Sequence, residues 1–231
     1  MTETSMPHPT PLPCPDFAAS APRPLSTPHW AEGGGIEVLP RIFEDAITLA
    51  VMRRPVGSEL LAGALAQVEA GRPLSFNWRG APGVELRTAL FETLAAPAAS
   101  VALVEDVVIL AEAMAFLFDT DTVGLRLRLM DAPMCPRFHC DNLPVRMITT
   151  YLGPGSEWLP EAAVNRAGLG APSAAKPAIV RDDGAIRRLE SGDVALLKGS
   201  GWIGNESHGL VHRSPALAEG QPRLLLTIDP G

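Results

Sequence analysis

The chain has 231 residues, of which 46% are hydrophobic and 19% are charged, and its formal net charge is −7. This length and hydrophobic content are sufficient for one domain with a sizeable core, or for two small domains. An acidic chain without a run of Lys or Arg argues against a nucleic-acid binder, which would normally present a basic stripe. We therefore expect a globular protein that does not bind nucleic acid.

No targeting or membrane segment is recognisable. The first thirty residues hold Pro, Ser and Thr in place of a basic start followed by an apolar run, so we expect no secretory signal. The longest apolar region, 101–118, is too short and too acidic to span a bilayer. The three cysteines form no even disulfide framework. These features predict a cytoplasmic protein with reduced thiols and no membrane contact.

Residues 1–33 are predicted to form a disordered tail. They include eight prolines, which remove backbone donors and block helix continuation. Histidine and cysteine side chains in such a segment are seldom ligands, so we exclude them from the site. We expect a single domain over 34–231, with a helical part at 34–121 and a β-rich part at 122–231.

Four helices are predicted in the helical part. Apolar residues recur at steps of three and four between 41 and 70, which predicts two amphipathic helices separated by Pro55. A third helix is expected over 84–94. A fourth is expected over 100–119, with Ser100 as its N-cap.

Short strands are predicted after residue 121. Residues 123–130 alternate apolar and polar side chains with the period of two that a half-buried strand requires. Many short strands separated by Gly-rich turns indicate a sandwich or a barrel. The other predicted strands are 145–152, 179–181, 185–189, 194–198, 210–212 and 224–228, with an inserted loop at 162–177.

A His-x-Asp pair, His139 and Asp141, is the strongest chemical signal in the β-rich part. Alternate residues of an extended segment point to the same face, so the two side chains would lie together. His212, on a neighbouring predicted strand, would complete a set of two imidazoles and one carboxylate. Such a set with open metal positions is the usual site of non-heme Fe(II) oxygenases. The alternative is a surface His-x-Asp pair that arises by chance.

The order of these residues along 123–230 resembles the Fe(II)/2-oxoglutarate-dependent dioxygenases. The elements that carry the resemblance are His-x-Asp, the strand 192–197, His212, and Arg223 at the start of the last strand. The resemblance implies an α+β fold in which N-terminal helices pack on a C-terminal double-stranded β-helix, the jelly-roll or cupin-like core. It also implies that His139, Asp141 and His212 bind Fe(II).

The same resemblance implies that Arg223 binds the distal carboxylate of 2-oxoglutarate and that Tyr151 adds a hydroxyl to it. A planar guanidinium suits bidentate contact with a carboxylate. Two alternatives stay open: Arg223 is a surface residue paired with Asp229 or Glu219, and Tyr151 is a core aromatic with a satisfied hydroxyl. Four polar residues near the predicted mouth are candidate substrate contacts, with solvated surface groups as the alternative: Arg146, Asn205, His208 and Arg213.

A second resemblance covers most of the chain after residue 33. The segments 136–139, 150–159, 197–199 and 209–215, together with 46–55, are similar to a bacterial family catalogued as domain of unknown function 1826. The resemblance implies bacterial origin and, through the gene neighbourhood of that family, a link to zinc homeostasis. It implies no established activity.

We therefore expect Fe(II)/2-oxoglutarate-dependent hydroxylation of an unknown substrate, either a small molecule or a protein. The alternative is a non-catalytic protein of metal homeostasis that binds Zn(II), because Cys135 and Cys140 add thiolates to the nearby imidazoles. Strand alternation opposes it, since Cys140 should face away from His139. A third hypothesis is an interaction module whose barrel has lost its chemistry.

Overall fold

The structure, a computed structural model, describes residues 28–231. Seven strands form a large sheet in the order β1-β2-β8-β5-β10-β4-β3, and three form a small sheet in the order β7-β6-β9. In the large sheet β1 and β2 are parallel, and the other neighbouring pairs are antiparallel. The strands are β1 (Trp30–Gly33), β2 (Leu49–Met52), β3 (Ser75–Gly80), β4 (Val123–Met130), β5 (Val145–Leu152), β6 (Glu157–Trp158), β7 (Arg187–Arg188), β8 (Val194–Lys198), β9 (His212–Arg213) and β10 (Arg223–Pro230).

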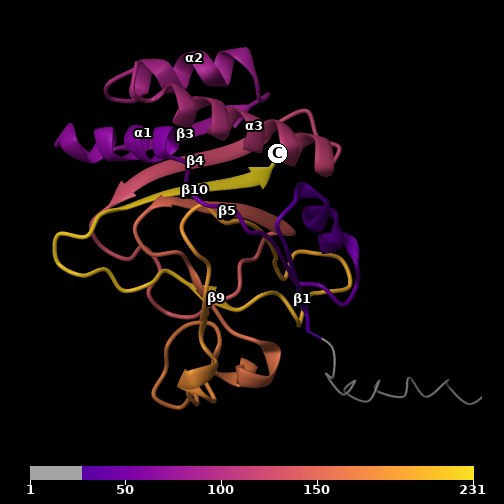
Figure 1. Cartoon of the computed structure of the whole chain (residues 1–231). Coiled ribbons are helices and arrows are strands. Elements are labelled where there is room, and N and C mark those ends of the chain that lie inside the picture. The colour runs from indigo at the N-terminus through magenta and orange to yellow at the C-terminus, as the bar shows by residue number, and fades with distance from the viewer. Residues whose placement is uncertain (1–27) are drawn as a thin grey trace, which may run out of the picture.

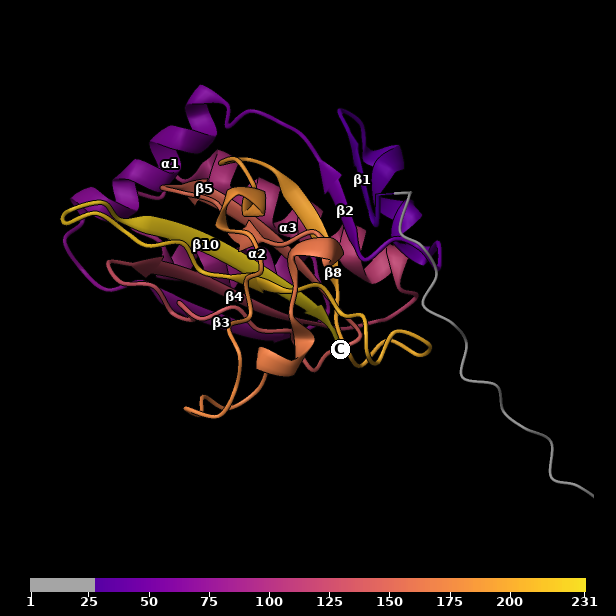
Figure 2. The same ribbon diagram turned by 90° about the horizontal axis from the view of Figure 1, so that it is seen from below.

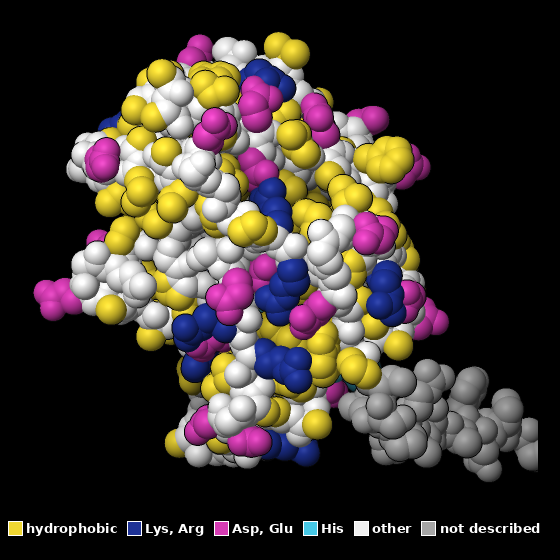
Figure 3. All heavy atoms as spheres, viewed as in Figure 1, with side chains coloured by type: hydrophobic (Ala, Val, Ile, Leu, Met, Phe, Trp, Pro, Cys, Tyr) yellow, Lys and Arg dark blue, Asp and Glu magenta, His cyan; other side chains and the backbone are white. Residues whose placement is uncertain are grey.

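Three helices cover one face of the large sheet, and the small sheet lies beyond the opposite face, as Figures 1 and 2 show. The helices are α1 (Ser58–Glu69), α2 (Val84–Thr93) and α3 (Val101–Leu117). On the side of the molecule seen in Figure 3, the helical layer at the top shows mainly hydrophobic and acidic side chains, and Lys and Arg are more numerous below it. Among the described residues, no helix has the length and apolar character needed to cross a membrane.

The two faces of the large sheet follow from strand alternation. On β10, Leu224, Leu226 and Ile228 belong to the core beneath the helices. Residues one position away point to the other side, because successive strand side chains alternate. There, side chains of β5 and β8 pack with Trp158 of the small sheet in a second apolar cluster. We call this side of the large sheet the small-sheet face.

Most of the predicted elements are confirmed. The helices at 84–94 and 100–119 and the strands at 123–130, 145–152, 194–198 and 224–228 agree with the structure to within two residues. At 185–189 and 210–212 only two-residue strands form, β7 and β9. At 179–181 there is only a single bridge, between Val164 and Val180. The predicted helical layer on a β-rich part is confirmed as a layer on a large, mostly antiparallel sheet.

Two expectations about the first half are wrong, and one strand there was not predicted. The first helix predicted between 41 and Pro55 is replaced by a 3-10 helix, η1 (Ile36–Phe43), and by β2. Strand β2 lies between β1 and β8 and is buried on both faces, and periodicity alone does not separate such a short apolar run from a buried helix. Strand β1 falls inside the expected tail 1–33, of which residues 1–27 lie outside the described part. Strand β3 was not expected at all.

Candidate metal centre

His139 and His212 are brought together by backbone pairing. His139 lies in the connection between β4 and β5, and it forms an isolated antiparallel bridge with His212 of β9. The amide of His139 donates to the carbonyl of His212 at 3.0 Å, and the reciprocal bond is 2.9 Å. Paired residues of an antiparallel ladder have their side chains on the same face. The ring centroids are accordingly 4.6 Å apart.

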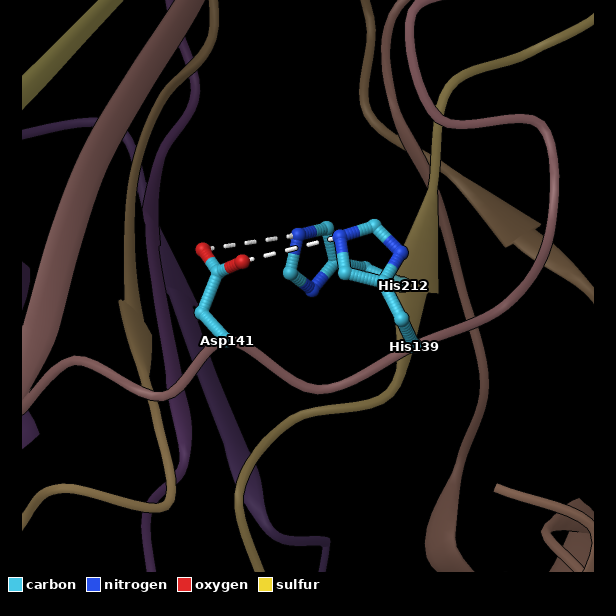
Figure 4. Close-up of side chains that lie close together, drawn as sticks. All are labelled: His139, Asp141 and His212. Atoms are coloured by element: carbon cyan, nitrogen blue, oxygen red, sulfur yellow. Dashed lines mark ion pairs between the residues drawn. The ribbon is translucent and has the colours of Figure 1, made fainter. Parts of the chain in front are cut away.

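Asp141 completes the cluster, as Figure 4 shows. Its Oδ1 lies 3.5 Å from His139 Nε2, and its Oδ2 lies 3.8 Å from His212 Nε2. One ligand atom from each residue lies within 4.8 Å of the other two. The three side chains that the sequence singled out therefore converge on one point, although they come from a loop and a strand that are distant in the chain.

The imidazole orientations favour metal binding through Nε2. His139 Nδ1 is 3.0 Å from the carbonyl oxygen of Arg137, and His212 Nδ1 is 3.3 Å from that of Leu210. A carbonyl oxygen only accepts hydrogen bonds, so each Nδ1 carries the proton in the neutral ring. Each Nε2 then directs its lone pair toward the centre of the cluster. Metal-bound histidines are commonly oriented by such a second hydrogen bond.

A chain of ion pairs holds the carboxylate. Arg146 Nη1 donates to Asp141 Oδ2 at 2.8 Å, while its Nε and Nη2 donate to Asp229 at 2.6 and 2.8 Å. Arg126 Nη1 also donates to Asp229, at 3.0 Å. Arg146 therefore positions Asp141 from the large sheet. The sequence suggested Asp229 only as a partner for Arg223. Strand alternation could have indicated its role, because it places Asp229 on the same face of the last strand as Arg223.

The electrostatics favour an ionised Asp141 and a neutral His212. Burial raises the pKa of Asp141, but the hydrogen bond from His139 and the nearby His212 and Arg146 outweigh it and bring the pKa to about 2. Burial lowers the pKa of His212 to about 4. The hydrogen bond with Asp141 raises the pKa of His139. Metal ligands must be deprotonated, so an ionised carboxylate and a neutral His212 suit this role.

The donor set fits a divalent transition metal with open positions. Two imidazole nitrogens and one carboxylate oxygen on one side of a centre are typical of non-heme Fe(II). Within residues 28–231 neither Cys135 nor Cys140 joins this cluster. The Sγ atom of Cys140 packs against Gly209 instead. A closed zinc site with thiolate ligands is therefore not favoured.

Within residues 28–231, Arg223 is buried and forms no ion pair with an acidic side chain. Its exposed fraction is 1%, and its Nη2 donates to Thr150 Oγ1 at 3.2 Å and to Ser156 Oγ at 2.9 Å. Its Nε and Nη1 have no hydrogen-bond partner, and burial lowers the pKa of the guanidinium to about 10. Pairing with Asp229 is not observed, because the two residues lie at opposite ends of β10, and Asp229 pairs with Arg126 and Arg146. The sequence did not predict that Thr150 and Ser156 accept hydrogen bonds from Arg223.

Arg223 belongs to the same inter-sheet region as the histidines. It shares its face of β10 with Thr227, whose β5 partner Ile148 packs on Trp158. Trp158 in turn is the strand partner of His212. Ser156, which accepts a hydrogen bond from Arg223, directly precedes β6. The guanidinium and the histidine cluster therefore lie on the same side of the large sheet, toward the small sheet.

Tyr151 lies elsewhere. It is fully buried among the residues beneath the helices, and its hydroxyl donates to Asp106 Oδ2 of α3 at 2.8 Å. Arg54 holds the same carboxylate. Tyr151 is thus a core aromatic with a satisfied hydroxyl, and the expectation that it contacts a cosubstrate is corrected. The reason is strand alternation, because Tyr151 points to the same side of β5 as Val145 and Met147, which also belong to the core beneath the helices.

The four candidate substrate contacts take different places. Arg146 adjoins the cluster through Asp141. Asn205 is buried and donates to the carbonyl of Gly199, as expected of a residue that fixes a turn. His208 is exposed beside Ser207. Arg213 follows His212 and therefore points away from it, where it pairs with Glu157 at 2.7 Å.

Solved structures similar to this chain include three oxygenases. A dioxygenase for auxin oxidation from rice has a TM-score of 0.50 at 16% identity, covering 87% of this chain and 82% of that one. The dioxygenase for auxin oxidation 1 of Arabidopsis thaliana, solved with 2-oxoglutarate, has a TM-score of 0.49 at 8% identity, with coverages of 87% and 91%. A Pseudomonas putida prolyl-4-hydroxylase has a TM-score of 0.42 at 14% identity, covering 84% of this chain and 96% of that one. At these identities the likeness concerns the fold alone.

Sequence comparison identifies the family. No curated protein matches the chain significantly. A family profile described as a protein of unknown function, DUF1826, matches residues 34–229. This range covers most of the chain and includes all the residues of the cluster, and it agrees with the motifs noted in the sequence. The chain belongs to the DUF1826 family.

Proposed function

We propose that this protein is an oxygenase that uses Fe(II) and 2-oxoglutarate to hydroxylate a substrate, on a double-stranded β-helix core formed by its two sheets. The observation that carries the proposal is Arg223, a buried guanidinium with two nitrogens lacking partners. It lies on the same side of the large sheet as a cluster of two histidines and one aspartate. A dicarboxylate that bridges a metal and an arginine would satisfy both.

The three clustered side chains would hold the metal. His139 and His212 would bind through Nε2, and Asp141 through one carboxylate oxygen. Three protein ligands leave positions of a six-coordinate ion open for a cosubstrate. Arg146 keeps the carboxylate in place because it bonds Asp141 and is itself held by Asp229.

Arg223 would bind the distal carboxylate of 2-oxoglutarate. A buried donor without an acceptor costs roughly 1–3 kcal/mol, and a buried charge without a counter-ion costs more. A carboxylate would supply both the acceptors and the opposite charge. Thr150 and Ser156 fix the guanidinium through Nη2 and leave Nε and Nη1 for the ligand.

When bound, Fe(II) supplies activation of O2 coupled to decarboxylation of 2-oxoglutarate. The protein's part is to orient the cosubstrate between the cluster and Arg223 and to exclude water between the sheets. Side-chain exposure differs at the centre, at 34% for His139 and 11% for His212. We therefore infer that the substrate approaches from the His139 side. The fold shared with the rice dioxygenase supports the reaction class and leaves the substrate open.

An anaerobic titration tests the proposal. Fe(II) is added to the metal-free protein with and without 2-oxoglutarate, and the visible metal-to-ligand charge-transfer band is recorded. We expect a band that requires both components and that weakens in Arg223→Ala. Cys140→Ser is the control and should leave the band unchanged, because Cys140 is outside the cluster.

Two outcomes would contradict the proposal. The first is a protein that binds Fe(II) without any band when 2-oxoglutarate is added. The second is tight Zn(II) binding that is lost in Cys140→Ser, which would support the alternative of a zinc-binding protein. Measurement of succinate formation under air adds a catalytic readout to the spectroscopic one.

A further inference from the structure

The small-sheet face of the large sheet carries more arginine than its carboxylates neutralise. The register of β3, β4, β10 and β5 aligns five arginines on this face, whereas Asp229 and the adjoining Asp141 are the carboxylates that pair with them in residues 28–231. The chain as a whole has a net charge of −7, so this concentration of positive charge is local. The five residues are Arg79, Arg126, Arg128, Arg146 and Arg223.

Arg128 is the arginine that the described fold leaves least satisfied after Arg223. Its Nε is buried without a hydrogen-bond partner. Its Nη1 donates only to Met134 Sδ, at 3.6 Å, and a thioether is a weak acceptor. No carboxylate of residues 28–231 forms an ion pair with it. An oxyanion would satisfy this half-buried guanidinium better than a neutral acceptor, because it supplies both hydrogen-bond acceptors and the opposite charge.

Arg126 stands two residues before Arg128 on the same face of β4. Its side chain is 44% exposed and pairs with Asp229. Because Arg146 joins Asp229 to Asp141, Arg126 is linked to the candidate metal centre through one ion-pair chain. A surface hollow of about 490 Å³ opens beside it, bordered by Asn77, Arg126 and Asp229 among others.

We propose that Arg128, with Arg126 beside it, binds an oxyanion group of the substrate, so that the protein acts on a small carboxylate- or phosphate-bearing molecule. This inference rests on the proposed function, and it names the substrate class for the same site. Alternate residues of a strand are about 6.8 Å apart, a spacing that lets two guanidinium groups contact one oxyanion. The rest of the substrate would then extend toward His139, the more exposed histidine.

Direct anion binding tests the inference. Inorganic phosphate and acetate are titrated separately into the metal-free full-length protein, with binding followed by calorimetry. We expect saturable binding of at least one of them, weakened tenfold or more in Arg128→Gln and less in Arg126→Gln. The anion that binds more tightly distinguishes a phosphate-bearing from a carboxylate-bearing substrate. Arg181→Gln, a change at an exposed loop arginine, is the matched control and should leave the affinity unchanged.

Arg223→Gln separates this site from the cosubstrate site. If the anion affinity falls only in Arg223→Gln, or if neither anion binds the unmodified protein, the inference is overturned. Equal losses in Arg181→Gln and Arg128→Gln would also overturn it, because they would indicate general charge attraction.

The charge-transfer titration keeps the two proposals distinguishable. Loss of anion binding in Arg128→Gln with a normal Fe(II)/2-oxoglutarate band supports both. Anion binding that depends on Arg128 in a protein without the band would retain the oxyanion site and reject the oxygenase.

Discussion

The two faces of the large sheet present opposite chemistry from the same strands. On β10, Leu224 and Leu226 are buried beneath the helices, while Arg223 and Asp229 lie on the small-sheet face. The first face is filled by apolar contacts from α1 and α3. On the second face, buried guanidinium nitrogens of Arg223 and Arg128 have no hydrogen-bond partner among residues 28–231. One face therefore stabilises the fold mainly by apolar packing, and the other holds cationic donors that a ligand can satisfy.

Unpaired buried donors on the small-sheet face lower the stability of the ligand-free protein. Buried polar groups are normally paired, and exceptions call for a specific explanation. Here the exceptions on the small-sheet side include nitrogens of two arginines, Arg223 and Arg128, together with the indole nitrogen of Trp158. Strained or unsatisfied groups at functional sites are retained because they bind ligands, at a cost to the stability of the free protein.

The largest expected effect is on the helix-covered face. Leu226→Ala removes a side chain that is 1% exposed in the main core and should lower the free energy of unfolding by about 2–5 kcal/mol. Thr227→Ala, one residue along on the other face, is the matched change and should cost less. Urea unfolding of both variants measures the contrast, and equal losses would contradict the division between the faces.

Replacing Arg146 should affect Fe(II) affinity more than the stability of the fold. Arg146→Gln removes the bond to Asp141 and should weaken Fe(II) affinity roughly 10–100-fold, the effect usual for residues that orient a metal ligand. Competition with a chelator under anaerobic conditions measures the affinity. An unchanged affinity in Arg146→Gln would mean that Asp141 does not depend on this contact.

Arg223 should show opposite effects on stability and on ligand binding. Arg223→Met keeps much of the side-chain volume but removes the buried donors that lack partners. The free energy of unfolding of the metal-free protein should therefore rise by about 1–3 kcal/mol, and affinity for 2-oxoglutarate should be lost. Thermal unfolding with and without 2-oxoglutarate tests both; a destabilised variant would show that Arg223 is structural.

The smallest expected effect is at Tyr151. Tyr151→Phe removes the hydrogen bond to Asp106, whose carboxylate is still held by Arg54, so the cost should be about 1 kcal/mol. Affinity for 2-oxoglutarate should not change, because the hydroxyl is on the helix-covered side. A large loss of cosubstrate affinity in this variant would show that the Tyr151 hydroxyl contacts the cosubstrate.

Local sequence patterns predicted the regular elements well where the pattern was long. The alternation in 123–130 and the apolar run of α3 span enough residues to define their period. The pattern failed for β2 and β3, which are short and whose strand state depends on pairing with β8 and β4. Backbone pairing with distant residues has no local signature, so these two strands could not be read from the sequence.

The members of the cluster could be predicted from residue type and spacing, since His139 and Asp141 are two residues apart and His212 was the remaining candidate on a predicted strand. Their surroundings could not, because they depend on the fold. Asp229 holds Arg146 rather than Arg223, Tyr151 faces α3, and Arg128 forms no ion pair with an acidic side chain of residues 28–231. The physical reason is that residue type sets what a group can bond, whereas strand register and packing set which groups meet and which are left without a partner.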